Sequence, residues 1–145
     1  MASSSASNYL QTALMNLLWF NTAWTPPSTV YVALFTAMPT YSTAGTEVST
    51  SGTAYARQPI LCTAPASGGW TGPSGTNLTY SNQSNIVYAT PTATWGTIVG
   101  AGLFDAVTAG NLLYFSQLST SKTVNNGDGA PQILAGQLQI TRATC

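Results

Sequence analysis

The sequence predicts a mainly β protein: an antiparallel β-sandwich or barrel, jelly-roll-like, with one N-terminal α-helix. Short apolar runs alternate with clusters of Gly, Pro, Asn and Ser from residue 30 to residue 141, which is the pattern of short strands joined by turns. Helical periodicity is confined to the beginning of the chain. A length of 145 residues and a hydrophobic content of 44% suit one core, so we expect a single domain over residues 1–145.

The first expected element is a helix over about residues 7–20. Ser7 is suited to cap its N-terminus, and the prolines at 26–27 prevent it from continuing. Apolar side chains recur there at helical spacing and continue to the end of the segment: Leu10, Leu14, Leu17, Leu18, Trp19 and Phe20. Because this is more apolar surface than one side of a short helix needs, we predict that these six residues include a contact with a neighbouring subunit or a capsid.

The elements that follow are expected to be strands. Residues 30–36 are almost wholly apolar, as in a strand buried on both faces. Residues 54–62 form the next strand, which Pro59 places at an edge because proline donates no ladder hydrogen bond. A Gly- and Pro-rich loop, anchored by Trp70, is expected over residues 63–76. Further strands are expected at residues 78–80, 84–88, 95–104, 112–118, 132–134 and 137–141.

The charge inventory argues against catalysis. Six residues are charged and histidine is absent, so the commonest general base and metal ligand is missing. Two cysteines are too few for a zinc site, and three scattered cations are too few for phosphate contacts. We therefore expect no enzyme, no catalytic residues, no cofactor and no metal. The pattern Ser119-x-x-Lys122 resembles a serine acyltransferase motif, but the other elements of that motif are missing.

Three charged residues interrupt stretches that are otherwise free of charge: Glu47, Arg57 and Asp105. Burial of a lone charge is costly, so such residues are paired or exposed. We expect Arg57 to form a structural ion pair with Glu47 or Asp105 and to fix strand register. The alternative is a pair of carboxylates that flank a cleft for glycoside hydrolysis, and we favour the structural role.

Short motifs run through nearly the whole chain: the helix around residues 8–14, the strand 30–36 followed by Met38-Pro39, and the segments 45–48, 55–58, 95–97, 104–106, 110–114, 122–124 and 136–140. In this order they resemble a family of small structural proteins of tailed bacteriophages, labelled as decoration, head or tail-fibre proteins. The chain departs from the family in the Gly/Pro-rich insertion around residues 64–76. The resemblance implies a structural role in a virion and no catalytic residue.

Together, the resemblance and the low charge favour a capsid decoration, or cement, protein that binds and stabilises the outer face of the major capsid shell. A neutral surface suits permanent contact with other protein. The expected partners are the major capsid protein and copies of the chain itself, as a homotrimer, with no nucleic acid and no membrane. The protein would be made in the host cytoplasm and reside on the capsid surface of the virion.

Two alternatives remain open at this stage. One is a structural or adhesion protein of the tail fibre or tail tip. The other is a small carbohydrate-binding module in which Trp70 or Tyr80 stacks on a sugar ring. The sequence also leaves open whether either cysteine forms a disulfide. Cys62 is expected to be a small buried residue, whereas Cys145 at the terminus is suited to cross-link to a neighbour.

Overall fold

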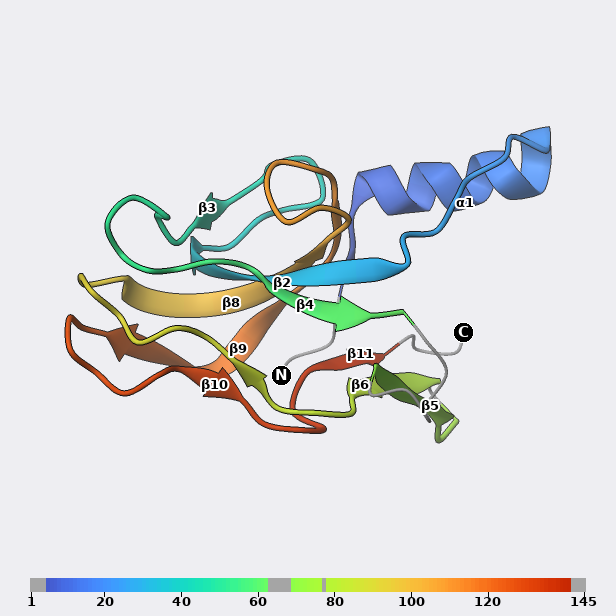
Figure 1. The fold of residues 1–145 in the computed structure, drawn as a ribbon. Helices are drawn as coiled ribbons and strands as arrows, with labels where there is room; N and C mark the ends of the chain where they lie inside the picture. Colours follow the sequence, from blue (N-terminus) through green and yellow to red (C-terminus); the bar gives the residue numbers. More distant parts are fainter. Residues whose placement is uncertain (1–4, 63–68, 77, 142–145) are drawn as a thin grey trace.

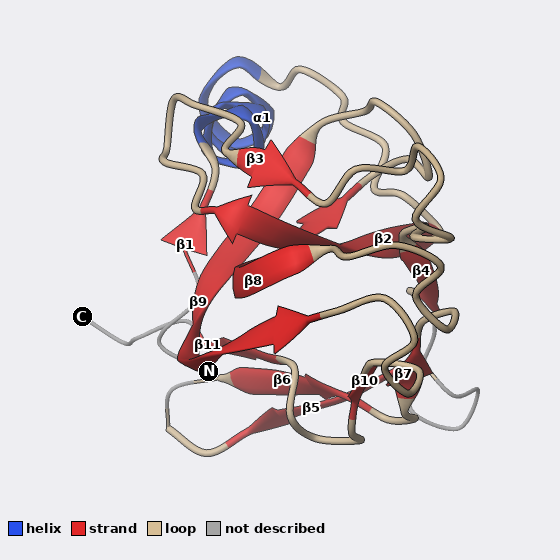
Figure 2. Cartoon of the chain, turned by 90° about the vertical axis from the view of Figure 1, so that its left-hand side faces the viewer, coloured by secondary structure: helices blue, strands red, loops and turns tan. Residues whose placement is uncertain are grey.

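The computed structural model describes residues 5–62, 69–76 and 78–141, which form two layers of antiparallel strands with a helix at one end (Figures 1 and 2). This confirms the predicted fold class. The elements are β1 (Ser5–Ala6), α1 (Asn8–Phe20), β2 (Thr29–Ala37), β3 (Thr46–Glu47), β4 (Gln58–Leu61), β5 (Trp70–Ser74), β6 (Thr79–Asn82), β7 (Ile86–Val87), β8 (Gly96–Phe104), β9 (Leu112–Val124), β10 (Gln132–Ile133) and β11 (Gln139–Thr141).

Within the described residues, the larger layer is a six-stranded sheet in the order β1–β9–β8–β2–β3, and β4 also pairs with β2. The smaller layer consists of the sheets β11–β6–β5 and β10–β7, which lie across from the larger sheet in Figure 2. Pro59 lies in β4 opposite Tyr31 of β2. The structure thus places this proline on an edge strand, where its missing N–H leaves no gap in the sheet.

The core explains why β2 is apolar along almost its whole length. Val32 belongs to the main cluster between the two layers and is fully buried. Ala33 and Phe35 are also fully buried, but they belong to a second cluster with Phe104. Successive side chains of a strand point to opposite faces, so β2 is covered on both sides, as its sequence predicts.

Glycine in β8 makes the second cluster possible. A Cβ atom on Gly102 would lie 2.6 Å from Cε2 of Phe35 and 2.9 Å from Cδ1 of Leu112. Phe35 is fully buried, whereas Leu112 is partly buried, so the ring of Phe35 occupies the space that the missing side chain of Gly102 leaves free.

Several predicted boundaries are wrong. Of the short strands, the one expected at 78–80 is β6 (Thr79–Asn82), the one at 84–88 is β7 (Ile86–Val87), and the one at 137–141 is β11 (Gln139–Thr141). The strand expected at 54–62 is limited to β4, because Ala54 adopts the left-handed conformation (φ 58°) and the carbonyl of Thr53 accepts a hydrogen bond from the indole of Trp95 (2.8 Å) instead of a strand partner. In the loop expected at 63–76, residues 63–68 lie outside the described part, but Trp70–Ser74 forms β5 and pairs with β6. Gly72 (φ 133°) allows the register shift in that pairing.

Strand β9 is also longer than predicted. It continues to Val124, six residues beyond the expected end, because Lys122, Thr123 and Val124 pair with the beginning of β8 after a register shift. The polar sequence of this half of β9 hid the strand, since most of its side chains are exposed.

Candidate interaction surface

The predicted charged cluster lies on the outer face of the larger sheet. Arg57 forms a bidentate ion pair with Glu47: its Nε lies 2.9 Å from Oε1 and its Nη2 lies 2.7 Å from Oε2. Its Nη1 donates to the carbonyl oxygens of Ala106 (2.9 Å) and Ala109 (2.8 Å). The guanidinium carbon lies 3.6 Å from the ring centroid of Phe104. One side chain therefore joins β3, the 105–110 turn and the second apolar cluster.

Tyr55, which is buried in the main core, also bonds to the Arg57–Glu47 ion pair. Its hydroxyl donates to Oε1 of Glu47 (2.9 Å) and accepts from the backbone N–H of Leu34 (2.9 Å). Burial raises the pKa of Tyr55 far above its usual value, so the phenol stays protonated at every physiological pH. Because the donor is permanent, the carboxylate of Glu47 is held by both a cation and a neutral hydroxyl.

The structure does not bring Asp105 to Arg57. Its carboxylate accepts from the backbone N–H of Asn111 (2.6 Å) and from the side-chain amide of the same residue (2.8 Å), which closes the turn before β9. Glu47 therefore binds Arg57, and Asp105 closes a turn. The two carboxylates do not face each other across a cleft, which is the arrangement that glycoside hydrolysis requires.

Helix α1 is anchored at its N-terminal end. Ser7 is its N-cap: the hydroxyl accepts from the N–H of Leu10 (3.2 Å), and the Ser7 N–H donates to the carbonyl of Leu113 in β9 (2.9 Å). Leu10 is 4% exposed and belongs to the main core, and Leu14 packs against that core. The first half of the helix is therefore part of the sandwich.

The second half of α1 leaves the body of the protein, as Figure 1 shows. Leu17 is 40% exposed, Leu18 72%, Trp19 71% and Phe20 76%. We call Leu18, Trp19 and Phe20 the helix tip. Of the six residues predicted as an interface, Leu10 faces the core and Leu14 is half-buried, whereas the remaining four present apolar surface to solvent. The stripe is continuous in sequence, but the strands beneath the helix end before it does.

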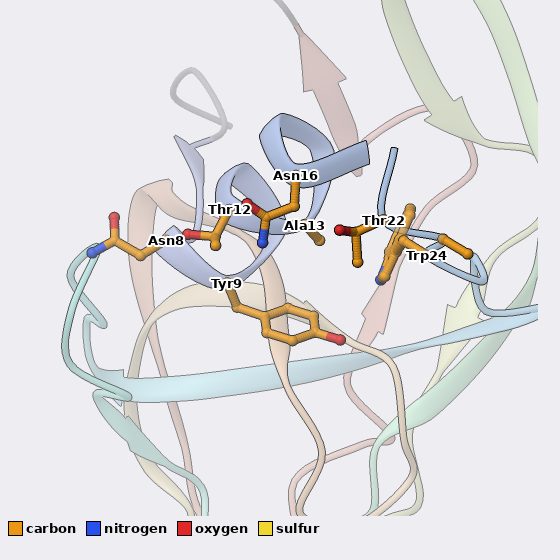
Figure 3. Close-up of a pocket in the computed structure, with 8 residues that line it drawn as sticks. Asn8, Tyr9, Thr12, Ala13, Asn16, Thr22 and Trp24 are labelled. Carbon is orange, nitrogen blue, oxygen red and sulfur yellow. The ribbon is translucent and has the colours of Figure 1, made fainter. Parts of the chain in front are cut away.

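A first hollow, of about 420 Å³, lies between α1 and the chain that returns to β2. Figure 3 shows Asn8, Thr12 and Asn16 along the helix with the ring of Tyr9, and Trp24 on the returning segment. These side chains are amides, hydroxyls and aromatic rings, and none of them is a carboxylate, an imidazole, an ammonium or a guanidinium group. The hollow therefore suits contact with a neutral surface and offers no group for acid–base chemistry.

A second hollow, of about 310 Å³, lies below the helix where both layers end. Its lining combines aromatic, proline and aliphatic side chains from both layers: Trp24, Pro26, Cys62, Trp70, Tyr80 and Ile140, with others of the same kind. We call it the apolar groove. The sequence analysis did not find it as a unit, because its residues are spread from position 10 to position 140 and meet only through the sheet pairing.

Three residues that the sequence analysis singled out line the apolar groove: Cys62, Trp70 and Tyr80. Trp70 packs against the main core while it lines the groove, and Tyr80 is 41% exposed at its rim. Cys62 is exposed, which contradicts its predicted burial, although its backbone N–H donates to the carbonyl oxygen of Ser28 (2.8 Å) just beyond the end of β4 at Leu61. Partial burial by the groove nevertheless raises the pKa of its thiol. Cys145 lies outside the described residues.

Other chemistry finds little support. Ser119 and Lys122 lie on the exposed half of strand β9, whereas the acyltransferase motif requires a helix that places serine and lysine together. In the described part of the chain, no three His, Cys, Asp or Glu side chains gather where they could hold a metal ion. Among the same residues we find no helix with the length and apolar character needed to cross a bilayer.

Comparison with known proteins gives one family. The family model described as podophage GP4 fiber I protein gp80 matches residues 5–141, which include both layers of the sandwich, α1 and the apolar groove. None of the curated proteins matches the chain.

Proposed function

Because the chain belongs to the podophage GP4 fiber I protein gp80 family, we propose that it is a structural subunit of a fibre on a bacteriophage virion. The match over residues 5–141 carries this proposal. Family membership confirms the predicted resemblance to phage structural proteins and implies a place in the virion. It favours the tail-fibre alternative over the capsid decoration role that the sequence analysis placed first.

The surface of the molecule supports a role in assembly. The helix tip holds three adjacent apolar side chains that are each more than 70% exposed. A contiguous apolar patch of this kind marks an interaction site, since isolated exposed apolar residues are normal but clusters are not. No charged residue belongs to the tip or to the lining of the groove. Contacts made there do not depend on ion pairs that salt would screen.

The charged side chains in the body of the molecule hold turns and strands together and do not form a catalytic group. Arg57 and Glu47 fasten the 105–110 turn and β3 to the sheet, and Asp105 closes the same turn. Because the chain has no histidine, both hollows lack the side chain that most often serves as a general acid or base near neutral pH. We propose that the protein acts by assembly with other protein, without a catalytic step, a cofactor or a nucleic-acid partner.

Capsid decoration is the second candidate. The observation that favours it is the exposed half of β9, from Gln117 to Thr123, which carries small hydroxyl side chains and one lysine. Such a face fits against a flat protein surface without a large charge to desolvate. In this case the partner would be the major capsid protein, and the protein would lie on the outside of the shell.

Labelled antibodies on purified virions, combined with copy number by quantitative mass spectrometry, separate the two candidates. The fibre proposal expects label on fibres and a copy number far below that of the major capsid protein. Label spread over the shell, with copies in the hundreds, would instead support decoration. Absence of the protein from purified virions would refute both.

A further inference from the structure

We propose that the first hollow, between α1 and the chain that returns to β2, binds a small neutral saccharide. The inference goes beyond the proposed structural role and adds a binding site to it. The lining of this hollow shares only Trp24 with the apolar groove. The shape of the hollow, the chemistry of its lining and the anchoring of its walls support the assignment.

The hollow has the size and shape of a site for a small molecule. Its volume of about 420 Å³ lies within the range of about 300–1,000 Å³ that is usual for ligand pockets. The helix forms one wall and residues 22–24 form the other (Figure 3). A small molecule or the end of a polymer can enter such a recess, whereas a flat protein face would pass over it.

Two aromatic rings in the lining supply surfaces for stacking. Tyr9 lies in the first turn of α1 and is 40% exposed. Trp24 lies on the returning segment, where it is half-buried and packs against the main core. Sugar rings present faces of C–H groups, which pack on the flat faces of tyrosine and tryptophan while the polar edge of each ring stays free to bond. The two rings therefore offer apolar contact to a molecule that is otherwise polar.

The polar part of the lining consists of amides and hydroxyls without protein partners. Asn8, Thr12 and Asn16 follow one another at intervals of four residues, so they share one face of α1. Thr22 belongs to the opposite wall. Among the described residues, none of these four side chains forms a hydrogen bond with another protein group. Amides and hydroxyls both donate and accept, as sugar hydroxyls do, so a saccharide can satisfy them.

The same lining argues against other classes of ligand. It contains no carboxylate, ammonium or guanidinium group, so it offers no ion pair to a phosphate, a carboxylic acid or an amine. A purely apolar ligand would displace water from the polar side chains without replacing the hydrogen bonds of that water, which lowers affinity. A neutral molecule with many hydroxyl groups avoids both costs.

Both walls of the hollow are anchored. The N-cap residue Ser7 bonds through its N–H to the carbonyl of Leu113, so β9 fixes the first turn of α1. At the other end, the N–H of Thr22 donates to the carbonyl oxygen of Asn16 (3.1 Å), which ties the returning segment to the helix. A site that is formed before the ligand arrives loses little conformational entropy on binding.

Calorimetric titration of the full-length protein tests the assignment. The probes are four uncharged oligosaccharides at millimolar concentration: maltohexaose, cellohexaose, mannohexaose and N-acetylchitohexaose. We expect at least one of them to bind, and an anionic oligogalacturonate to bind more weakly. Tyr9→Ala should weaken the binding about 10-fold, because it removes a stacking ring. Thr12→Val should weaken it about threefold, because it exchanges a hydroxyl for a methyl group of similar shape.

Tyr80→Ala is the matched control. Tyr80 is 41% exposed, close to the 40% of Tyr9, but it lines the apolar groove and not this hollow. Loss of binding in Tyr80→Ala with none in Tyr9→Ala would place the sugar in the groove and overturn the proposal. Absence of binding for all four neutral probes would also overturn it, as would equal binding of the anionic probe. Circular dichroism checks that each variant keeps the β fold.

A protein occupant of the hollow gives a different result. If no oligosaccharide binds and Tyr9→Ala changes the oligomeric state in sedimentation, the hollow is a protein contact and the saccharide proposal is wrong. Virion labelling and saccharide titration are separate measurements. If the label lies on fibres while the titration fails, the fibre role stands and the saccharide site does not; the reverse result would keep the site and refute the fibre role.

Discussion

Arg57→Ala should be among the most damaging single substitutions on the outer face of the larger sheet. The change removes four hydrogen bonds, two to Glu47 and two to the carbonyls of Ala106 and Ala109, and it uncovers the ring of Phe104. The side chain of Arg57 is 8% exposed and that of Glu47 is 24% exposed. The substitution therefore leaves a mostly buried carboxylate with the hydroxyl of Tyr55 as its protein donor.

The expected loss in free energy of unfolding is about 3 kcal/mol. Removal of one partner of a fully buried ion pair costs about 3–5 kcal/mol, and the partial exposure of Glu47 places this pair at the low end. The contact with Phe104 adds to the loss, since a cation over an aromatic ring contributes about 0.5–2 kcal/mol. The two carbonyls recover hydration in part, because the 105–110 turn lies at the surface. For a domain of this size the midpoint of thermal unfolding should fall by roughly 6–12 °C.

Urea denaturation followed by tryptophan fluorescence measures this loss at one fixed protein concentration. Arg57→Lys is the matched control: it keeps the charge but loses the bidentate fork, so it should lose less than Arg57→Ala. A double-mutant cycle with Glu47→Gln should give a coupling energy of about 1–3 kcal/mol. A loss below about 1 kcal/mol for Arg57→Ala, or a coupling energy of zero, would refute the structural role assigned to the pair.

Four further substitutions test the packing. Leu14→Ala should lower the free energy of unfolding by about 2 kcal/mol because Leu14 packs on the core, whereas Leu18→Ala, at an exposed position, should change it by less than about 0.5 kcal/mol; equal effects in urea would contradict the division of α1. Gly102→Ala should cost about 1–3 kcal/mol by overpacking against Phe35, and an unchanged thermal midpoint would argue against that contact. Tyr55→Phe should cost about 1–3 kcal/mol, since a buried N–H of β2 loses its acceptor, and faster amide exchange at that N–H is the check.

The sequence predicts the fold class because its strongest patterns are local. The continuous apolar run around Val32 and the edge position of Pro59 follow from strand chemistry alone. Elements whose pairing depends on distant residues are missed. β1 and β3 have two residues each and exist only through their partners β9 and β2. β5 is hidden because its glycine and proline resemble a loop, although Gly72 serves a register shift within a strand pair.

The candidate surface shows the same limit. Helical spacing predicts an apolar stripe on α1, but it does not show where the sandwich beneath it ends, so Leu10 and Phe20 look equivalent in the sequence. Their exposed fractions are 4% and 76%. The groove has no local pattern at all, because Trp24, Cys62 and Tyr80 meet only after both sheets have formed. A surface assembled from several elements can be found only in the tertiary structure. For a surface on one helix, the sequence predicts which residues are apolar but not which of them are exposed.

The positions of the charged residues indicate which kind of contact the protein can make with its partners. Within the described residues, Arg57 and Glu47 neutralise each other, Asp105 closes the turn before β9, and Asp128 accepts from the N–H of Asn125 in the turn after it (2.7 Å). These charges hold the fold, and neither the helix tip nor the apolar groove contains a charged side chain, so association through the helix tip depends on apolar contact. Apolar association resists salt but weakens on cooling, because the hydrophobic effect is entropic near room temperature. An assembly built on the helix tip should therefore persist at high ionic strength and loosen in the cold.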